Sequence, residues 1–202
     1  MIHFNDSWGE NADPDSITQA MLETGAGAGD PMQPGDTALL VELEQGLYTA
    51  IVRSQDDTSG IALVEAFEVS ENLTRFVNVS SRAFVGTGDE IVIPGFIVLG
   101  DLPSRVLIRA IGPGLEKKEV AGVLEFPEIT VFNILREPIA HNDGWGNLWN
   151  PAEINEASAL VNTEPLDEGS EDAAIILELE PGLYTVKVNG ENDTTGVALV
   201  EV

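Results

Sequence analysis

The chain has 202 residues, a formal net charge of −26 and a sequence pI near 4.1. Because contacts to phosphate need Lys and Arg, this charge argues against a nucleic-acid partner. The hydrophobic fraction of 43% separates the chain from disordered acidic tails, and no apolar run reaches the roughly 18–20 residues that span a membrane. The chain has no cysteine, which excludes disulfide bonds and thiolate metal sites.

The first 65 residues begin with the motif NDSWG at residues 5–9. A helical segment of one or two turns is expected next, because Asp13 resembles an N-cap and Pro14 fits the first helical position. After a glycine-rich loop come three segments rich in Val, Ile, Leu and Tyr and bounded by Gly, Asp and Ser, at residues 38–43, 46–54 and 60–69. This composition predicts three β-strands.

The middle of the chain contains four more predicted strands, at residues 75–86, 90–100, 104–112 and 128–134. Pro94 lies inside the second of them. Because proline cannot donate to a strand ladder, this position predicts a sheet edge or a bulge. Turn residues separate the strands at intervals of about 8–15 residues, which is typical of a β-sandwich.

The end of the chain repeats its beginning. NDGWG at residues 142–146 matches NDSWG, and the proline that follows an N-cap residue returns at Asn150-Pro151. Two longer blocks also match: residues 36–49 with 172–185 (nine of fourteen identical) and residues 58–65 with 194–201 (six of eight identical). In the second copy Leu177 and Leu179 alternate with Glu178 and Glu180, as in a half-buried strand. Three collinear matches indicate a repeat architecture.

We therefore predict an all-β fold of antiparallel β-sandwich repeats, about one and a half units, with at most short helical turns after each NDxWG motif. Residues 1–65 are called the N-terminal back half, residues 66–138 the front half and residues 139–202 the C-terminal back half. The expected domains are the N-terminal back half, which has no partner half in the sequence, and a full sandwich repeat over residues 66–202.

Charge follows the same division. The two back halves carry net charges of −11 and −12, whereas the front half carries −3 and holds seven of the nine Lys and Arg residues. Arg109, in the segment RAIGPGL at residues 109–115, has two interpretations. It can pair with a carboxylate of a back half, or it can simply end a strand before a Gly-Pro-Gly turn. The sequence leaves both open.

Several motifs together resemble a known family. The front half carries SSRAFVGTG, IPGFIVLG and VLIRAIGPGL, and the C-terminal back half carries NDGWG, PGLYT and TTGVALVEV. These resemble tandem repeats of very large secreted proteins of environmental bacteria and, more weakly, β-sandwiches of the bacterial pre-peptidase C-terminal type. The resemblance covers nearly the whole chain and implies a secreted, modular, non-catalytic β-sandwich. Ser7 and Gly144 depart from the second acid of the usual NDDW motif, which weakens a metal site built on it.

The NDxWG motif can be interpreted in two ways. Ca²⁺ takes about six to eight oxygen ligands. Candidate ligands are Asn5, Asp6, Asp36, Asn142, Asp143, Glu171 and Asp172. The other interpretation is an Asx-turn, in which the Asn and Asp side chains bind their own backbone while the tryptophan packs on the edge of the core.

The three tryptophans, Trp8, Trp145 and Trp149, are candidates for an aromatic platform that binds sugar, or for plugs of the core. No Ser-His-Asp arrangement recurs between the copies, and no HExxH motif is present. Carboxylates are too abundant for any pair to identify a glycosidase. The sequence therefore predicts a protein that is not an enzyme.

The unmatched half leads to the functional hypothesis. A strand that has no partner acts as a template for pairing with another chain. A head-to-tail contact between subunits that does not close into a ring produces a filament. We expect an extracellular or cell-surface structural protein, a subunit or repeat of a filament, sheath or adhesin that forms a head-to-tail homopolymer by strand or edge complementation. The alternative is a carbohydrate-binding module of a secreted protein. No signal-like segment follows Met1, so the protein is either cytosolic or a mature or excised portion of a longer protein, and the repeat favours the second.

Overall fold

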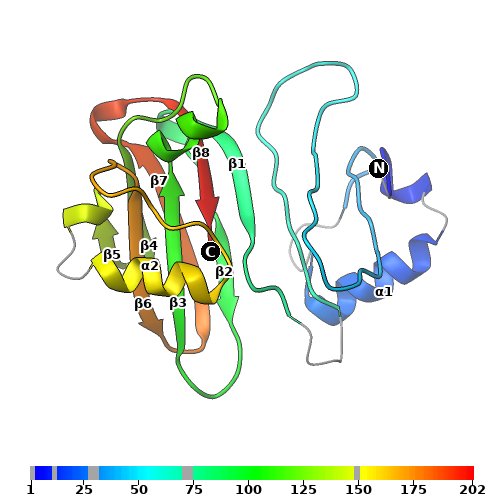
Figure 1. The fold of residues 1–202 in the computed structure, drawn as a ribbon. Coiled ribbons are helices and arrows are strands. Elements are labelled where there is room, and N and C mark those ends of the chain that lie inside the picture. Colours follow the sequence, from blue (N-terminus) through cyan, green and yellow to red (C-terminus); the bar gives the residue numbers. More distant parts are fainter. Residues whose placement is uncertain (1–2, 11–12, 27–31, 70–74, 148–150) are drawn as a thin grey trace. The chain divides into compact units, whose positions relative to one another are not determined.

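The computed structural model describes residues 3–10, 13–26, 32–69, 75–147 and 151–202. The chain divides into two compact units, residues 1–76 and residues 77–202. In the described part of the chain, the second unit contains every strand, whereas the first contains a helix and a long extended segment drawn as plain tube (Figure 1).

Eight strands make up the second unit. Their bounds are β1 (Ser80–Val85), β2 (Gly95–Val98), β3 (Ser104–Ile111), β4 (Pro127–Phe132), β5 (Pro138–Asn142), β6 (Ala173–Leu179), β7 (Gly182–Gly190) and β8 (Gly196–Glu201). Short 3-10 turns lie between them: η2 (Gly88–Glu90), η3 (Pro113–Lys118), η4 (Trp145–Asn147) and η5 (Glu191–Asp193).

The strands form two antiparallel four-stranded sheets, in the orders β1-β8-β3-β6 and β2-β7-β4-β5. Apolar side chains of both sheets form one core, which includes Ile108, Ile129 and Val186. Burial alternates along β7, as expected for a strand with one face on the core. The predicted all-β, sandwich-like fold is confirmed for this unit.

Pro94 lies directly before β2, which is an edge strand of its sheet. The Pro94 carbonyl accepts a hydrogen bond from the Val186 amide at 2.8 Å. The edge position predicted from this proline is confirmed, because its missing N–H interrupts no central ladder.

Within the second unit, strands of the back half pair only with strands of the front half. β6 pairs with β3, β7 pairs with β2 and β4, and β8 pairs with β1 and β3. β5, which begins at the last residue of the front half, pairs with β4. Because each of these back-half strands needs a front-half neighbour, a back half alone cannot build either sheet.

A helix covers the outer face of the first sheet. α2 (Pro151–Leu160) lies against β3 and β6 (Figure 1), and its Ile154 packs in a second cluster with Trp145, Leu166 and Ala174. In the first unit, α1 (Pro14–Thr24) follows the 3-10 turn η1 (Trp8–Glu10). At eleven and ten residues, both helices are longer than the predicted one or two turns, because each buries side chains of its inner face.

The N-cap predicted at Asp13 is confirmed. The Ser16 amide donates a hydrogen bond to the Asp13 carboxylate at 3.0 Å, and Pro14 opens the helix. Hydrogen bonds from the Ser16 hydroxyl and amide hold the pKa of Asp13 below its usual value. The matching Asn150 lies outside the described residues, although Pro151 does open α2.

The three strands predicted at residues 38–43, 46–54 and 60–69 are wrong for the first unit. Within its described residues the backbone there forms no strand ladder. The corresponding residues of the C-terminal back half are strands β6, β7 and β8. The physical reason is the pairing pattern above: these segments need front-half neighbours, and the only front half of this chain is in the second unit.

Candidate functional site

The NDxWG motif has the same local geometry in both copies. Asn142 is buried; its side-chain amide donates to the Gly144 carbonyl at 3.1 Å, and its oxygen accepts from the Ala174 amide at 2.9 Å. Asn5 makes the equivalent bonds to the Ser7 carbonyl, at 2.8 Å, and from the Ala38 amide, at 3.1 Å. Each asparagine therefore ties its motif to the start of the segment that follows the helix.

A backbone bond extends this equivalence to the tryptophans. The Trp145 amide donates to the Asp172 carbonyl at 2.8 Å, and the Trp8 amide donates to the Asp36 carbonyl at 2.9 Å. The Trp145 indole N–H binds the Ser170 hydroxyl, and that of Trp8 binds the Gln33 carbonyl. The N-terminal back half thus keeps the local structure of its copy although it has no sheet.

The strongest link between the halves in the second unit is buried. Arg109 of β3 lies opposite Glu201 of β8, and the two side chains form an ion pair in which both are buried. The Arg109 Nε donates to Glu201 at 2.8 Å, and the remaining N–H groups also bind Ser158, Thr163 and the Glu164 carbonyl. All five guanidinium donors are therefore satisfied, as a buried arginine requires.

The pairing of Arg109 with a back-half carboxylate, one of the two interpretations of RAIGPGL, is confirmed. The Gly-Pro-Gly turn after it is also held by a back-half acid. Asp172 accepts from the Gly112 amide at 2.9 Å and from the Gly114 amide at 3.2 Å. A Cβ on Gly114 would lie 2.9 Å from the Asp172 carboxylate, so glycine permits this approach.

The exposed ion pairs follow the same rule. Arg105 pairs with Glu153, Lys117 with Asp167 and Lys118 with Glu164, so each front-half base in these pairs meets a back-half acid. The hydrogen bond and charge of Lys118 hold the pKa of Glu164 below its usual value. Like Arg109–Glu201, these pairs join the front half to the back half, which fits the division of charge between the halves.

The same positions of the N-terminal back half lack such partners. Glu65, which matches Glu201, is exposed and makes no side-chain hydrogen bond to any residue that the structure describes. Asp36, which matches Asp172, is exposed and accepts from the Gln33 amide at 2.6 Å. These two carboxylates occupy the positions from which the second copy binds its front half.

The apolar side chains show the same difference. Val52 is 61% exposed where the matching Val188 is fully buried, and Val64 is 63% exposed where Val200 is 3% exposed. We call residues 36–65 the unpaired segment. Its exposed large apolar side chains are Leu39, Leu40, Leu43, Leu47, Tyr48, Ile51, Val52, Ile61, Leu63 and Val64. Exposed large apolar side chains that gather on a surface mark interaction sites, and the unpaired segment is the candidate functional site.

Each candidate Ca²⁺ ligand is either exposed or already bound to backbone amides. Asp6, Asp143 and Glu171 are exposed, and Asn5 and Asn142 use their side-chain oxygens for backbone amides. Asp172 is buried and bound to two amides and the Ser170 hydroxyl, and Asp36 binds the Gln33 amide. Among the residues that the structure describes, no three His, Asp or Glu side chains form a group able to hold a metal ion.

The three tryptophans of the candidate sugar platform do not share one environment. Trp145 is 4% exposed and packs with Ile154 and Leu166, so its ring offers no face to a sugar. Trp8 is half-buried in the first unit, and Trp149 lies outside the described residues.

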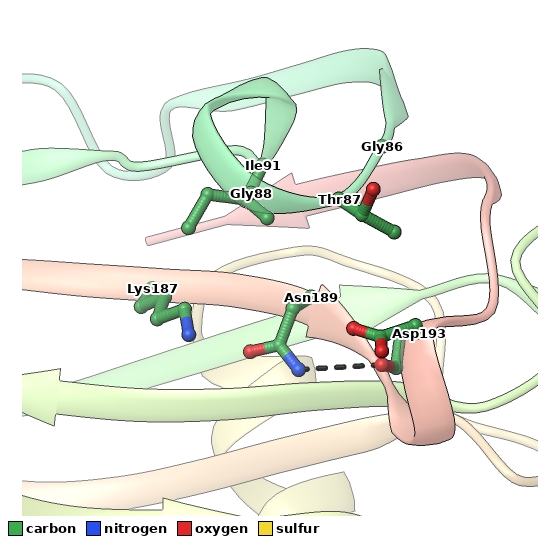
Figure 2. Close-up of a pocket in the computed structure, with 8 residues that line it drawn as sticks. Gly86, Thr87, Gly88, Ile91, Lys187, Asn189 and Asp193 are labelled. Atoms are coloured by element: carbon green, nitrogen blue, oxygen red, sulfur yellow. Dashed lines mark hydrogen bonds between the residues drawn. The ribbon is translucent and has the colours of Figure 1, made fainter.

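The second unit has one small polar hollow of note. Gly86, Thr87 and Ile91 line one side of it, and Lys187, Asn189 and Asp193 line the other; the Asn189 amide binds the Gly190 carbonyl at 3.3 Å (Figure 2). With a volume of about 110 Å³ it is far smaller than the roughly 300–1,000 Å³ of ligand sites.

The sequence did not predict all of the hydrogen-bond partners of Arg109. Ser158, Thr163 and the Glu164 carbonyl come from α2 and the loop after it, which have no matching contact in the first copy. A polar serine at the position where a helix faces a sheet was the available signal, since buried polar groups must be hydrogen-bonded.

The chain matches none of the family models, curated proteins or solved structures with which it was compared. No helix in the described part of the chain is long and apolar enough to cross a lipid bilayer.

Proposed function

We propose that this protein is a non-catalytic extracellular structural protein, a β-sandwich subunit or repeat of a surface filament, sheath or adhesin. In this proposal it consists of about one and a half repeat units. Strand complementation through the unpaired segment joins it head to tail to its neighbours.

One observation carries the proposal. The unpaired segment has the sequence of a three-stranded half sandwich and its local hydrogen bonds, yet its apolar side chains are exposed. Exposed strand-forming segments are templates for pairing with another chain. Burying one Val or Leu side chain stabilises by about 1.5–3 kcal/mol, so covering several of them drives a stable association.

The high acidity fits this role, because a large net charge keeps such subunits soluble before they assemble. The motif resemblance to repeats of large secreted proteins supports the extracellular placement. The polar hollow beside Lys187 and Asn189 is too small for a drug-sized ligand.

Immunogold electron microscopy of the producing cells tests this function, with antibodies raised against the second unit. We expect label along filaments, a sheath or other surface assemblies. Label confined to the cell interior, or to dispersed particles in the medium, would contradict the proposal.

A further inference from the structure

We infer that the partner of the unpaired segment is a front half supplied from outside residues 1–202, a polypeptide segment of the same kind as residues 77–138. This inference rests on the proposed function and names the partner that strand complementation requires. Three features specify this partner. They are the strand order of the second unit, its two buried carboxylates Glu201 and Asp172, and the number of halves in residues 1–202.

The strand order sets what can be added. β7 lies between β2 and β4, and β8 lies between β1 and β3. A back half therefore enters between front-half strands in both sheets. Addition to the outer edge of a finished sandwich would give one strand of the unpaired segment a neighbour and leave the others without one.

The carboxylates set the chemistry of the partner. Glu201 requires the guanidinium of Arg109, and Asp172 requires the amides of a Gly-Pro-Gly turn. Glu65 and Asp36 stand at the matching positions and are exposed. The partner segment must therefore bring an arginine three residues before a glycine turn, together with apolar strands on both sides of it.

The number of halves excludes a second copy as a sufficient partner. Residues 1–202 contain two back halves and one front half, and the strands of that front half are already paired with residues 173–201. A second copy could exchange one back half for another, but one back half for every chain would stay unpaired. A separate front half removes the deficit.

The first test mixes the full chain with a polypeptide of residues 77–138, both diluted from denaturant. We expect a 1:1 complex in light scattering and slowed amide exchange at residues 39–65. Glu65→Gln should weaken this complex at least about tenfold, because it leaves the arginine of the partner buried beside a neutral group. Glu42→Gln is the matched control: its counterpart Glu178 is exposed in the finished sandwich, so binding should change less than about twofold.

A fusion protein provides a second test that does not depend on the solubility of the free polypeptide of residues 77–138. Residues 77–138 are joined directly ahead of residue 2 of the full chain, in the front-then-back order of residues 77–202. We expect amide exchange at residues 39–65 to slow by about a hundredfold or more, as in a formed sheet. Unchanged exchange there in the fusion overturns the inference, as does equal binding by the Glu65 and Glu42 variants.

The failure of this inference differs from that of the proposed function. If the chain alone protects residues 39–65 in oligomers of its own, a second copy is the partner, and the inference is overturned while a structural role stands. If the fusion folds but the protein is absent from surface assemblies, the proposed function fails and the pairing stands.

Discussion

The two back halves differ in what surrounds them far more than in their sequences. Residues 1–65 and 139–202 share the NDxWG anchor, the asparagine bonds and the tyrosine bond to the carbonyl four residues earlier, made by Tyr48 and by Tyr184. Among the residues that the structure describes, only the second copy forms strands. The comparison separates two levels of structure: bonds close in sequence form in both copies, whereas ladders form only where a front half is present.

The comparison also shows where stability comes from. The tyrosine and asparagine bonds need no partner half, but burial of the apolar strand faces does. Val188 is fully buried between front-half strands, and Val52 is not. Most of the free energy of folding of a back half must therefore come from its front half, since apolar burial is the dominant favourable contribution.

The largest loss of stability is expected from a substitution that breaks the buried ion pair. Glu201→Ala should lower the free energy of unfolding of the second unit by about 3–5 kcal/mol, because it leaves Arg109 buried without its counter-charge. Glu65→Ala, at the matching exposed position, should change stability by less than about 0.5 kcal/mol. Urea unfolding followed by circular dichroism measures both. Equal losses would mean that Glu65 already has a partner.

A smaller effect is expected from the core. Val188→Ala should destabilise the second unit by about 2 kcal/mol, through lost burial and the cavity left behind. Val52→Ala should be nearly neutral, within about 0.5 kcal/mol, because its side chain is exposed. Thermal unfolding of the two variants measures this difference, and a clear loss of stability in Val52→Ala would show that the unpaired segment is packed in the free chain.

Much of the second unit was predictable from its residues. Apolar runs bounded by turn residues predicted the four strands β1 to β4, and Pro94 predicted an edge or a bulge. The role of Arg109 stayed open because an ion pair between β3 and β8 joins residues that are 92 positions apart, and spacing in sequence carries no sign of that contact.

The first unit was predicted less well for a related reason. The segments GLYTAIVRS and GLYTVKVNG have the same strand-forming character, and only one of them is a strand. Strand propensity describes how well a segment fits a sheet, not whether a neighbouring strand is available. The candidate metal ligands depended on the same missing information, because Asn142 and Asp172 bind backbone amides of other segments.

A third pair of variants tests the asparagine hydrogen bonds that both copies share. Asn142→Ala should cost about 1–2 kcal/mol, because it removes two hydrogen bonds at a buried site. Asn5→Ala should cost less in stability, but it should speed amide exchange at Ala38 just as Asn142→Ala does at Ala174. If exchange at Ala38 did not change, the anchor of the N-terminal copy would not be formed without its front half.

The smallest expected effect comes from the residue that precedes each helix, which is titratable before α1 and not before α2. The hydrogen bonds of Ser16 lower the pKa of Asp13, so Asp13 stabilises α1 fully above its unfolded-state pKa of about 3.9, and this contribution is lost as pH falls through the lower native value. The matching residue before α2 is Asn150, which does not titrate. Chemical shifts of the two helices, measured by NMR from about pH 5 to pH 2, should show α1 losing helicity before α2 does. Asp13→Asn should remove that difference, because asparagine caps a helix without a titratable group; if α1 frayed with the same pH dependence in that variant, the cap would not be the cause.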